Sequence, residues 1–546
     1  MKNRAITGGV IGLLAGIPWL VFSFAGEQIA RLPVAPFNLF EMLTRLLPGG
    51  VVTSGIELMV QSLNALRLGP TSALGKMVEM AMAFLLALVI LILLGSLYAI
   101  SLAKVRGSLV LKGVLAGLAL WVLTLPVIAW GGWGEPGALP SALWVLGLSL
   151  AWGIALAWGV ERAIVALESN VDAGRGRLLA QIAAGSLVLS GGAILLGRLA
   201  ERRSTEEVAR LATPAPTGAG GATATVETGK PGFVRVPGTR PELTPIGDFY
   251  RVDINLLPPG QEEFSRSTSD LAKRLRAQGG ETEVLTESYI LSVGGLVEKE
   301  LLLDLNQLKQ YPKIEQYATL ACISNPVGGD LISTTLFSGA RLKDVLDQAG
   351  LKPEAVDIKF TCVDGYTESL PIESATDERT LLCYSMDNQP LEQEHGAPLR
   401  LYTPDRFGMK NPKWIVKIEA INEDYQGYWE KRGWSEPAWV QTTSVIDATE
   451  AKDQGQILAG GIAFAGARGI EAVQVRLDQG DWVPAELDAP VSPLTWVLWR
   501  ANLPYSPGSH QLTVRAVDGT GEVQTPERSD THPAGATGYY TTTINV

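Results

Sequence analysis

The sequence of 546 residues is poor in cysteine and histidine, with three residues of each. Cys322, Cys362 and Cys383 are odd in number and form no C-x-x-C pair, so the sequence indicates neither a disulfide framework nor a zinc ribbon. The missing C-x-x-C-H motif also argues against covalently attached haem. No histidine precedes residue 395, so the apolar first 200 residues offer no axial pair for a haem b.

Positive charge is also scarce. The 45 lysines and arginines are outnumbered by 56 aspartates and glutamates, and the formal net charge is −11. Nucleic-acid-binding domains need a basic surface. The composition therefore excludes nucleic acid as the expected partner.

Long apolar runs fill the first 200 residues, whereas the remainder has the composition of a soluble protein. A membrane-spanning helix needs roughly 20 apolar residues. Residues 39–68 carry Glu41, Arg45, Pro48 and Glu57 and are predicted instead to form an amphipathic helix pair at the membrane interface. Five runs predict spans: Ala5–Ala25, Met77–Ala103, Gly113–Trp130, Ser141–Val160 and Leu178–Leu199.

Basic residues set the expected orientation, because loops rich in Lys and Arg stay in the cytoplasm. Lys2 and Arg4 precede the first span, and further basic residues fall between the second and third spans and between the fourth and fifth. Everything after Leu199 is then extracytoplasmic. Charges inside the spans are too few to favour a transporter, so we interpret this part as an anchor.

The rest of the chain predicts a linker and two folded parts. Residues 201–246 are rich in Ala, Thr, Gly and Pro and predict a flexible linker after the anchor of residues 1–200. Residues 247–442 mix strand-like segments with the short amphipathic helices DLNQLKQY and ARLKDVLDQAG, as in an α+β domain. Residues 443–546 have short strands at about ten-residue spacing, which is typical of an immunoglobulin-like β-sandwich. The fold class is thus multi-domain.

Cys322 is the first candidate for chemistry. It lies in ATLACISNPVGGD, where a strand-like run gives way to a polar, glycine-containing loop. A thiolate at the end of a rigid element suits a soft metal or a nucleophile. A buried, inert cysteine remains the alternative, and it is the interpretation we favour for Cys362 and Cys383.

Two further segments are candidate ligand sites. EHGAPLRLYTPDRFGMKNPKW concentrates His395, Arg400, Arg406, Lys410 and Lys413, a composition that suits a phosphate but also an ordinary charged loop. DYQGYWEKRGW, residues 424–434, is dense in aromatic residues. It indicates either a ligand pocket or aromatic packing between domains.

Taken together, these motifs resemble the sulfite oxidase family of molybdopterin enzymes over residues 247–546. The resemblance depends on the order of ACISNPVGGD, VDGYTESLP, HGAPLRLYTPDRFGMKNPKW and DYQGYWEKRGW, followed by IAFAG and RAVDGTG. It implies an α+β cofactor domain and an immunoglobulin-like domain that commonly makes a homodimer contact. It also implies two-electron oxygen-atom transfer on a small substrate.

The resemblance assigns roles to individual residues. Cys322 is the expected thiolate ligand of molybdenum, and Trp434 stands where sulfite-oxidising members carry a catalytic tyrosine. The expected cofactor-binding residues are Phe249, Tyr250, Arg251, Asp364, His395, Arg400, Asn411, Pro412 and Lys413.

The departures from the family pattern concern the substrate. Sulfite-oxidising members carry basic residues just after the cysteine motif, where this chain has Pro326 and Val327. Sulfite is therefore a doubtful substrate, and reduction of a sulfoxide is an alternative. A non-catalytic, membrane-tethered binding protein on the same fold is a second alternative.

Electron transfer needs a separate carrier, a c-type cytochrome or a membrane redox partner, because the sequence has no haem-binding motif. Family members that act outside the cytoplasm are exported folded by the twin-arginine route. Arg175 and Arg177, split by Gly176, resemble such a signal and equally suit the basic flank of a spanning helix.

Overall fold

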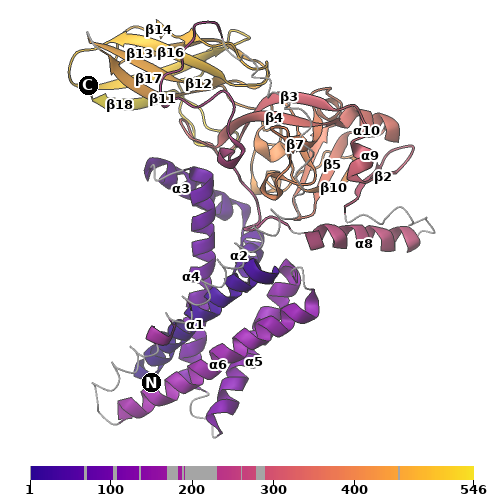
Figure 1. The fold of residues 1–546 in the computed structure, drawn as a ribbon, viewed down its shortest axis with the longest axis vertical. Helices are drawn as coiled ribbons and strands as arrows, with labels where there is room; N and C mark the ends of the chain where they lie inside the picture. The colour runs from indigo at the N-terminus through magenta and orange to yellow at the C-terminus, as the bar shows by residue number, and fades with distance from the viewer. Residues whose placement is uncertain are drawn as a thin grey trace, which may run out of the picture. The chain divides into compact units, whose positions relative to one another are not determined.

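The computed structural model describes residues 2–66, 70–101, 107–133, 137–168, 183–186, 190, 230–259, 261–277, 289–452 and 455–545. The chain divides into two compact units, which are described separately. The first comprises residues 1–47 and 76–221, and the second comprises residues 48–75 and 222–546. Figure 1 shows the helices of the first unit in indigo to magenta.

The first unit is built from long apolar helices. They are α1 (Lys2–Ala30), α2 (Ala35–Leu46), α4 (Thr71–Ile100), α5 (Leu109–Gly131) and α6 (Ala138–Glu168). Four are long and apolar enough to cross a membrane, namely α1, α4, α5 and α6, and α2 with α3 (Gly49–Leu66) would count as one more only if the pair formed a single broken span. The four runs predicted before residue 160 are therefore helices, whereas the fifth, Leu178–Leu199, lies largely outside the described residues.

Small residues bring these helices close together. A Cβ added at Gly12 would lie 2.5 Å from the carbonyl oxygen of Leu91, and one at Gly117 would lie 2.6 Å from that of Ser149. Small residues at a helix interface allow such close approach of the backbones. Leu85 and Leu93 on α4 stay exposed.

The second unit contains a mixed domain with two five-stranded sheets. One has the order β2 (Leu301–Leu303), β1 (Leu291–Gly295), β10 (Ile415–Ile421), β5 (Asp357–Cys362) and β6 (Thr367–Pro371). The other runs β3 (Ile314–Ala321), β4 (Ile332–Arg341), β7 (Leu381–Met386) and β8 (Gln389–Pro390), with β9 (Arg400–Tyr402) paired to β7. The β1–β10 pair is parallel and the other strand pairs are antiparallel.

Helices cover the first of these sheets. The remaining helices of the domain are α8 (Gln261–Ala277), α9 (Leu305–Leu308), α10 (Leu342–Ala349) and α11 (Ile372–Ala375). The two short amphipathic helices predicted from the sequence are α9 and α10. Leu342, Val345 and Leu346 of α10 are fully buried in the core, as their spacing on one helix face requires.

The C-terminal part consists of two four-stranded antiparallel sheets that share one core (Figure 1). The first sheet has the order β11 (Thr443–Lys452), β12 (Gln456–Phe464), β16 (Val497–Pro504) and β15 (Glu486–Leu487). The second has the order β14 (Val483–Pro484), β13 (Ile470–Leu477), β17 (Ser509–Asp518) and β18 (Tyr540–Asn545). Apolar residues alternate inward along these strands, as in Leu512, Val514 and Ala516 of β17.

The second unit also includes α3, from the segment predicted as an interfacial helix pair. α2 and α3 are indeed two helices. Glu57 of α3 accepts a hydrogen bond of 3.1 Å from the backbone N–H of His532, and Val60 joins the apolar cluster around Tyr250 and Leu494.

Candidate functional site

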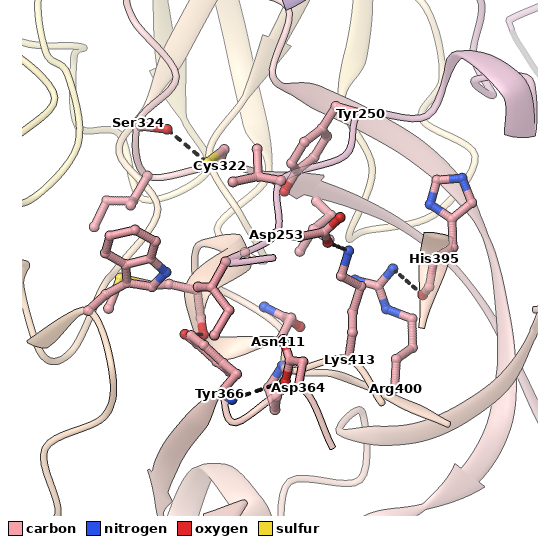
Figure 2. A pocket seen from close by; sticks show the side chains of 18 of the residues that line it. Tyr250, Asp253, Cys322, Ser324, Asp364, Tyr366, His395, Arg400, Asn411 and Lys413 are labelled. Carbon is pink, nitrogen blue, oxygen red and sulfur yellow. Dashed lines mark hydrogen bonds and ion pairs between the residues drawn. The ribbon is translucent and has the colours of Figure 1, made fainter. Parts of the chain in front are cut away.

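One pocket in the second unit collects residues that lie far apart in the sequence (Figure 2). Of the eleven residues predicted from the sequence, ten line it: Cys322, Trp434, Phe249, Tyr250, Asp364, His395, Arg400, Asn411, Pro412 and Lys413. Arg251 does not line the pocket. It forms an ion pair with Asp253, which does line the pocket. The fold thus converts scattered motifs into a single site.

Cys322 follows directly after β3 and begins a tight turn. Its N–H donates to the carbonyl of Leu331 at 2.9 Å, and its own carbonyl accepts from the N–H of Asn325 at 3.1 Å. The side chain of Asn325 accepts from the N–H of Leu331 at 2.9 Å, which closes the loop. These bonds fix the direction of the thiol at the pocket.

The thiol of Cys322 lies 3.0 Å from the hydroxyl oxygen of Ser324. Burial raises the pKa of Cys322, while the hydrogen bonds from Ser324 oppose that shift. A thiol in this environment becomes a thiolate most readily when a cation is present to bind it. Cys362 and Cys383 are also buried, as predicted, and neither lines the pocket.

Arg400, on β9, supplies a buried cation to the pocket. Its Nη1 donates to the carbonyl of His395 at 3.1 Å, whereas its Nε is buried without a hydrogen-bond partner among the described residues. Burial lowers the pKa of Arg400, with Cys383 the largest of the influences that oppose the shift. An unsatisfied buried donor on a cation is unfavourable unless an anionic ligand completes it.

Lys413 lies beside Arg400 and is paired with the buried carboxylate of Asp253 (Figure 2). Its Nζ also donates to the carbonyl of Glu394 at 3.0 Å. Burial lowers the pKa of Lys413 to about 8, against the opposing effect of Asp253. Arg251 contacts Asp253 too, so this carboxylate is shared between two cations.

His395 ends the short 3₁₀ helix η3 (Gln393–His395) and is 5% exposed. Burial, with the charges of Arg400 and Lys413, lowers its pKa to about 4, so the imidazole is neutral at pH 7. Its ring meets Phe249 edge-on at 5.5 Å between centroids. The cation-rich end of the pocket therefore favours an anion, and a neutral imidazole can still donate one hydrogen bond.

Asn411, Pro412 and Asp364 hold the loops at this end. The Oδ1 of Asn411 accepts from the N–H of Thr403 at 2.7 Å, and its Nδ2 donates to the carbonyl of Phe407 at 3.1 Å. The carbonyl of Pro412 accepts from the N–H of Leu401 at 2.9 Å. Asp364 accepts from the N–H of Tyr366 at 3.0 Å. Their side chains and backbone thus shape the pocket wall.

Apolar and aromatic side chains form the wall at the other end, beside Cys322. Trp429 and Trp434 meet edge-on at 6.5 Å between ring centroids. The indole Nε1 of Trp434 is buried and finds no hydrogen-bond partner among the described residues. Both tryptophans also pack in a cluster with Val445 and Phe464 of the C-terminal sheets. The aromatic segment therefore serves as pocket lining and as packing between domains.

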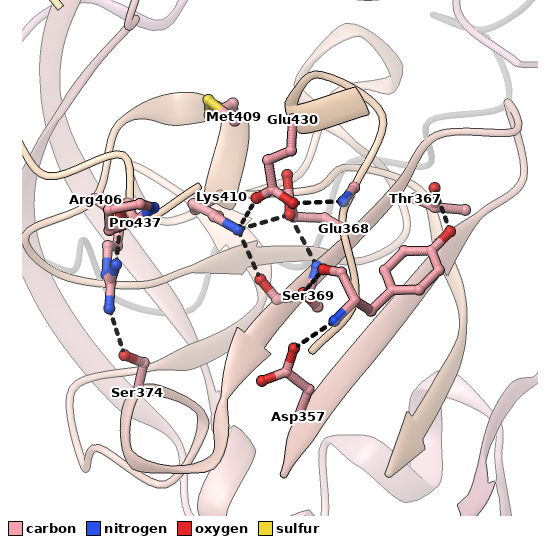
Figure 3. A network of polar contacts seen from close by, with 12 residues as sticks. Asp357, Thr367, Glu368, Ser369, Ser374, Arg406, Met409, Lys410, Glu430 and Pro437 are labelled. Carbon is pink, nitrogen blue, oxygen red and sulfur yellow. Dashed lines mark hydrogen bonds and ion pairs between the residues drawn. The ribbon is translucent and has the colours of Figure 1, made fainter. Parts of the chain in front are cut away.

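The prediction that the charged loop forms one anion site is wrong for Arg406 and Lys410. Neither side chain lines the pocket with the other cations of that loop. Arg406 lies over the ring of Trp439 at 3.5 Å and donates to the hydroxyl of Ser374 at 2.9 Å. Lys410 turns into the interior toward Glu368 and Glu430 (Figure 3). A loop that reverses direction sends neighbouring side chains to opposite sides, which composition alone does not reveal.

Among the residues that the sequence reasoning missed, three polar ones adjoin its motifs: Asp253, Ser324 and Tyr366. Asp253 lies two positions after Arg251, and Ser324 two after Cys322, so each adjoins a motif that was identified. The sequence did not indicate Asp253 as a site residue, because a negatively charged side chain is not expected beside an anion-binding site. Tyr366 lines the pocket from the VDGY motif, of which only Asp364 was predicted.

Within the described ranges, no group of three or more His, Cys, Asp or Glu side chains could hold a metal ion by itself. The unpaired donor of Arg400 and the single thiol of Cys322 suit a cofactor that carries both a phosphate and a metal.

Comparison with known proteins agrees with this geometry. Residues 279–429 match the family model described as the oxidoreductase molybdopterin binding domain. An uncharacterized oxidoreductase of Bacillus subtilis, YuiH, is 32% identical over 144 residues, which are 26% of this chain and 71% of that protein. This chain belongs to the sulfite oxidase family of molybdopterin-dependent oxidoreductases.

Other sulfite oxidase relatives match a longer stretch. The mitochondrial sulfite oxidase of Drosophila melanogaster is 29% identical over 303 residues, or 44% of this chain and 52% of that protein. The chain thus spans about half the length of that enzyme. The sulfane dehydrogenase SoxCD from Paracoccus pantotrophus superposes with a TM-score of 0.42 at 23% identity, over 49% of this chain and 78% of the other.

The chain thus belongs to a family of oxidoreductases, and the family match and the relatives indicate that it binds a molybdopterin cofactor. The resemblance inferred from the motifs is confirmed at this level. In the described part of the chain, α1, α4, α5 and α6 have the length and apolar composition of membrane-spanning helices.

Proposed function

We propose that the chain is a membrane-anchored, extracytoplasmic oxidoreductase that catalyses two-electron oxygen-atom transfer on a small substrate. The observation that carries the proposal is the shared pocket of Cys322 with the buried cations Arg400 and Lys413. A soft ligand at one end and anion-binding groups at the other match the two ends of a molybdenum–pterin cofactor.

In this proposal each end of the pocket has a defined role. Cys322 binds the metal through its thiolate, and Arg400, Lys413 and neutral His395 bind the phosphate of the pterin. Phe249, Tyr250, Arg251, Asp364, Asn411 and Pro412 shape the cofactor cradle. When bound, the cofactor supplies a centre that exchanges an oxygen atom and two electrons with the substrate.

The substrate end is apolar. Ile323, Met409, Trp429 and Trp434 line it, and in this proposal the cations of the pocket bind the phosphate. We therefore propose a small substrate without net charge in place of the sulfite anion. The unpaired indole N–H of Trp434 would donate a hydrogen bond to an oxygen atom of that substrate.

The direction of turnover follows from the substrate. Oxidation of a small sulfur or carbon centre and reduction of a sulfoxide use the same pocket in opposite directions. Electrons would pass to or from a separate carrier, a c-type cytochrome or a membrane redox partner. A non-catalytic binding protein is the second candidate, favoured by Pro326 and Val327 in place of basic residues and by Trp434 in place of a tyrosine.

The domain boundaries proposed from the sequence are residues 1–200 for the anchor, 201–246 for the linker, 247–442 for the cofactor domain and 443–546 for the C-terminal domain. We propose that the last is an immunoglobulin-like sandwich that makes a homodimer contact. Its first sheet, in order β11-β12-β16-β15, and its second, β14-β13-β17-β18, follow the A-B-E-D and C′-C-F-G strand orders of that fold.

The test of the proposal is the molybdenum and pterin content of the full-length protein, produced in a bacterium that makes the cofactor. Near-stoichiometric molybdenum is expected in the parent protein and in Cys383→Ser, a buried cysteine that does not line the pocket. Cys322→Ser should lose metal or all turnover with a panel of sulfoxides and sulfite. A folded parent protein with neither metal nor pterin would support the binding-protein alternative.

A further inference from the structure

Behind the pocket lies a buried cluster of three charged side chains, Glu368, Lys410 and Glu430 (Figure 3). Glu368 is on β6, Lys410 on the 3₁₀ helix η4 (Gly408–Lys410) and Glu430 on the 3₁₀ helix η5 (Glu430–Arg432). Their exposed fractions are 0%, 2% and 6%. Charged side chains are almost never buried this deeply unless they are paired.

The cluster is closely bonded. Nζ of Lys410 donates to Oε1 of Glu368 at 2.9 Å, to the carbonyl of Ser369 at 3.2 Å and to Oε1 of Glu430. Oε1 of Glu368 also accepts from the N–H of Ser369 at 2.9 Å. All three protons of the ammonium are thus used, and Oε1 of Glu368 is satisfied.

The charges of the cluster do not balance if every group is ionised. Two carboxylates and one ammonium leave one negative charge in the interior, which is strongly unfavourable. Burial raises the pKa of Glu368 to about 8; Lys410 opposes this shift and Glu430 adds to it. Burial opposes the charge on Lys410, but the two carboxylates outweigh it and raise its pKa. The neutral state of the cluster therefore holds one proton on Glu368.

Tyr366 gives independent geometric support for that proton. Its hydroxyl oxygen lies 2.6 Å from the carbonyl oxygen of Met409 and 3.1 Å from Oε2 of Glu368. A phenol has a single proton to donate. If it goes to Met409 over the shorter distance, a proton on Oε2 of Glu368 completes the longer contact.

Tyr366 also connects the cluster with the pocket, because it lines the same cavity as Cys322 and Trp434. The other titratable groups that face Glu368 or Tyr366 are Cys362 on β5, Asp364, Tyr428 and Glu430, and Glu430 in turn faces Glu436. Burial raises the pKa of Tyr366 well above its ordinary range, so it stays a phenol. A phenol between two proton-exchanging groups passes protons by giving one while taking another.

We propose that Glu368 exchanges a proton with the pocket through the hydroxyl of Tyr366, while Lys410 and Glu430 hold its carboxyl group at the balance between the charged and neutral forms. The proposal rests on the oxygen-transfer function above. Oxidation of a substrate X follows X + H₂O → XO + 2 H⁺ + 2 e⁻. The electrons leave to the separate carrier. One of the two protons goes to bulk water, and the other passes through the Tyr366 hydroxyl to Glu368 when that side chain is in its carboxylate form. In the reductive direction the carboxyl group returns it.

A purely structural role for the cluster makes a different prediction. In that case the three side chains only tie η4 and η5 to β6, and the neutral amide of Glu368→Gln would replace a protonated carboxyl group with no functional effect. The comparison that separates the two cases is Glu430→Gln, which alters the same cluster at a carboxyl group that has no hydrogen bond to the Tyr366 hydroxyl.

The first measurement is infrared titration of the full-length protein, which needs neither substrate nor turnover. A C=O band of a buried protonated carboxyl group should disappear as the pH rises through about 8. The band should be absent in Glu368→Gln and perturbed in Tyr366→Phe. In Glu430→Gln it should titrate at lower pH, because a neighbouring negative charge is gone. A band that never titrates, or one that survives in Glu368→Gln, overturns the proposal.

The second measurement is a redox titration of the molybdenum centre, monitored by paramagnetic resonance, across the same pH range. The potential should change slope near pH 8 in the parent protein, at lower pH in Glu430→Gln and not at all in Glu368→Gln. Molybdenum with an unchanged profile in Glu368→Gln refutes the proton role and leaves the function standing. A protein without molybdenum refutes the function, and the proton role with it.

Discussion

Burial and the charges of Arg400 and Lys413 all lower the pKa of the His395 imidazole. The pKa of His395 is about 4 in the folded cofactor-free protein and 6.5 in the unfolded chain. Between these pH values the unfolded chain therefore binds a proton at His395 and the folded protein does not. The free energy of unfolding should therefore fall as the pH drops from 6.5 to 4, by roughly 2 to 3 kcal/mol. His395→Gln should flatten this slope in urea denaturation at a series of pH values.

The control for this prediction is His510, where the sign is opposite. A hydrogen bond to Asp478 raises the pKa of His510, so its contribution is present at low pH and lost as the pH rises. His510→Gln should therefore leave unchanged the fall in the free energy of unfolding between pH 6.5 and pH 4. An unchanged acid slope in His395→Gln would mean that the imidazole is not held neutral.

Arg400 tests the phosphate end of the pocket. Its buried, unpaired Nε predicts a charge-assisted hydrogen bond to the pterin phosphate, worth about 2 kcal/mol. Arg400→Met should release the cofactor on gel filtration with roughly thirtyfold weaker retention. The matched control is Arg379→Met, whose exposed pair with Asp377 should contribute little. Equal molybdenum retention in both variants would argue against this assignment.

Some residues of the pocket could be predicted from the sequence, because their residue type in that local pattern has few roles other than ligand binding. A lone cysteine after a strand and a histidine–arginine pair in a glycine-containing loop are such cases, and they line one pocket. Asp253 could not be predicted, because its role is an ion pair with Lys413, which is distant in the sequence and comes close only in the folded chain. Lys410 was misplaced because its partners Glu368 and Glu430 come from two other elements.

The turn between η3 and β9 shows how a short element places the cations. Gly396 has a φ of +109°, and a Cβ there would lie 3.0 Å from the Cβ atoms of both Arg400 and Lys413. Gly396→Ala should therefore displace both cations, cost about 1 to 3 kcal/mol in stability and weaken molybdenum retention. Metal analysis and thermal unfolding of the same sample measure the two effects.

Gly469 is the matched control, since its φ is +69° but a Cβ there would meet nothing within 4 Å. Gly469→Ala should lower the free energy of unfolding by about 1 kcal/mol, because alanine is strained at a positive φ. Its molybdenum content should equal that of the parent protein. Loss of metal in both variants would show that retention follows overall stability instead of the local geometry.

At the level of elements, periodicity predicted the amphipathic helices and the strands best. The buried face of α10 follows from the positions of Leu342, Val345, Leu346 and Ala349 alone. The strand orders of the sheets were not predictable, because β10 pairs in parallel with β1 from more than 100 residues away. Such pairings depend on tertiary contacts that no local pattern encodes.

At the scale of the whole molecule, the prediction concerns topology. Basic loops and an odd number of spans predict that the catalytic part lies outside the cytoplasm. A C-terminal alkaline phosphatase fusion should be active, because this reporter needs disulfide bonds that form outside the cytoplasm. An inactive phosphatase fusion together with an active C-terminal β-galactosidase fusion would contradict the orientation. Arg175 and Arg177, the candidate export signal, lie outside the described residues.

The central claim is that Cys322 binds the molybdenum of a pterin cofactor. The most direct test is the number of sulfur neighbours of molybdenum, measured by X-ray absorption on the full-length parent protein and on Cys322→Ser. The account predicts a metal-loaded parent protein and one sulfur neighbour fewer in the variant. An equal sulfur count in two metal-loaded proteins would contradict it.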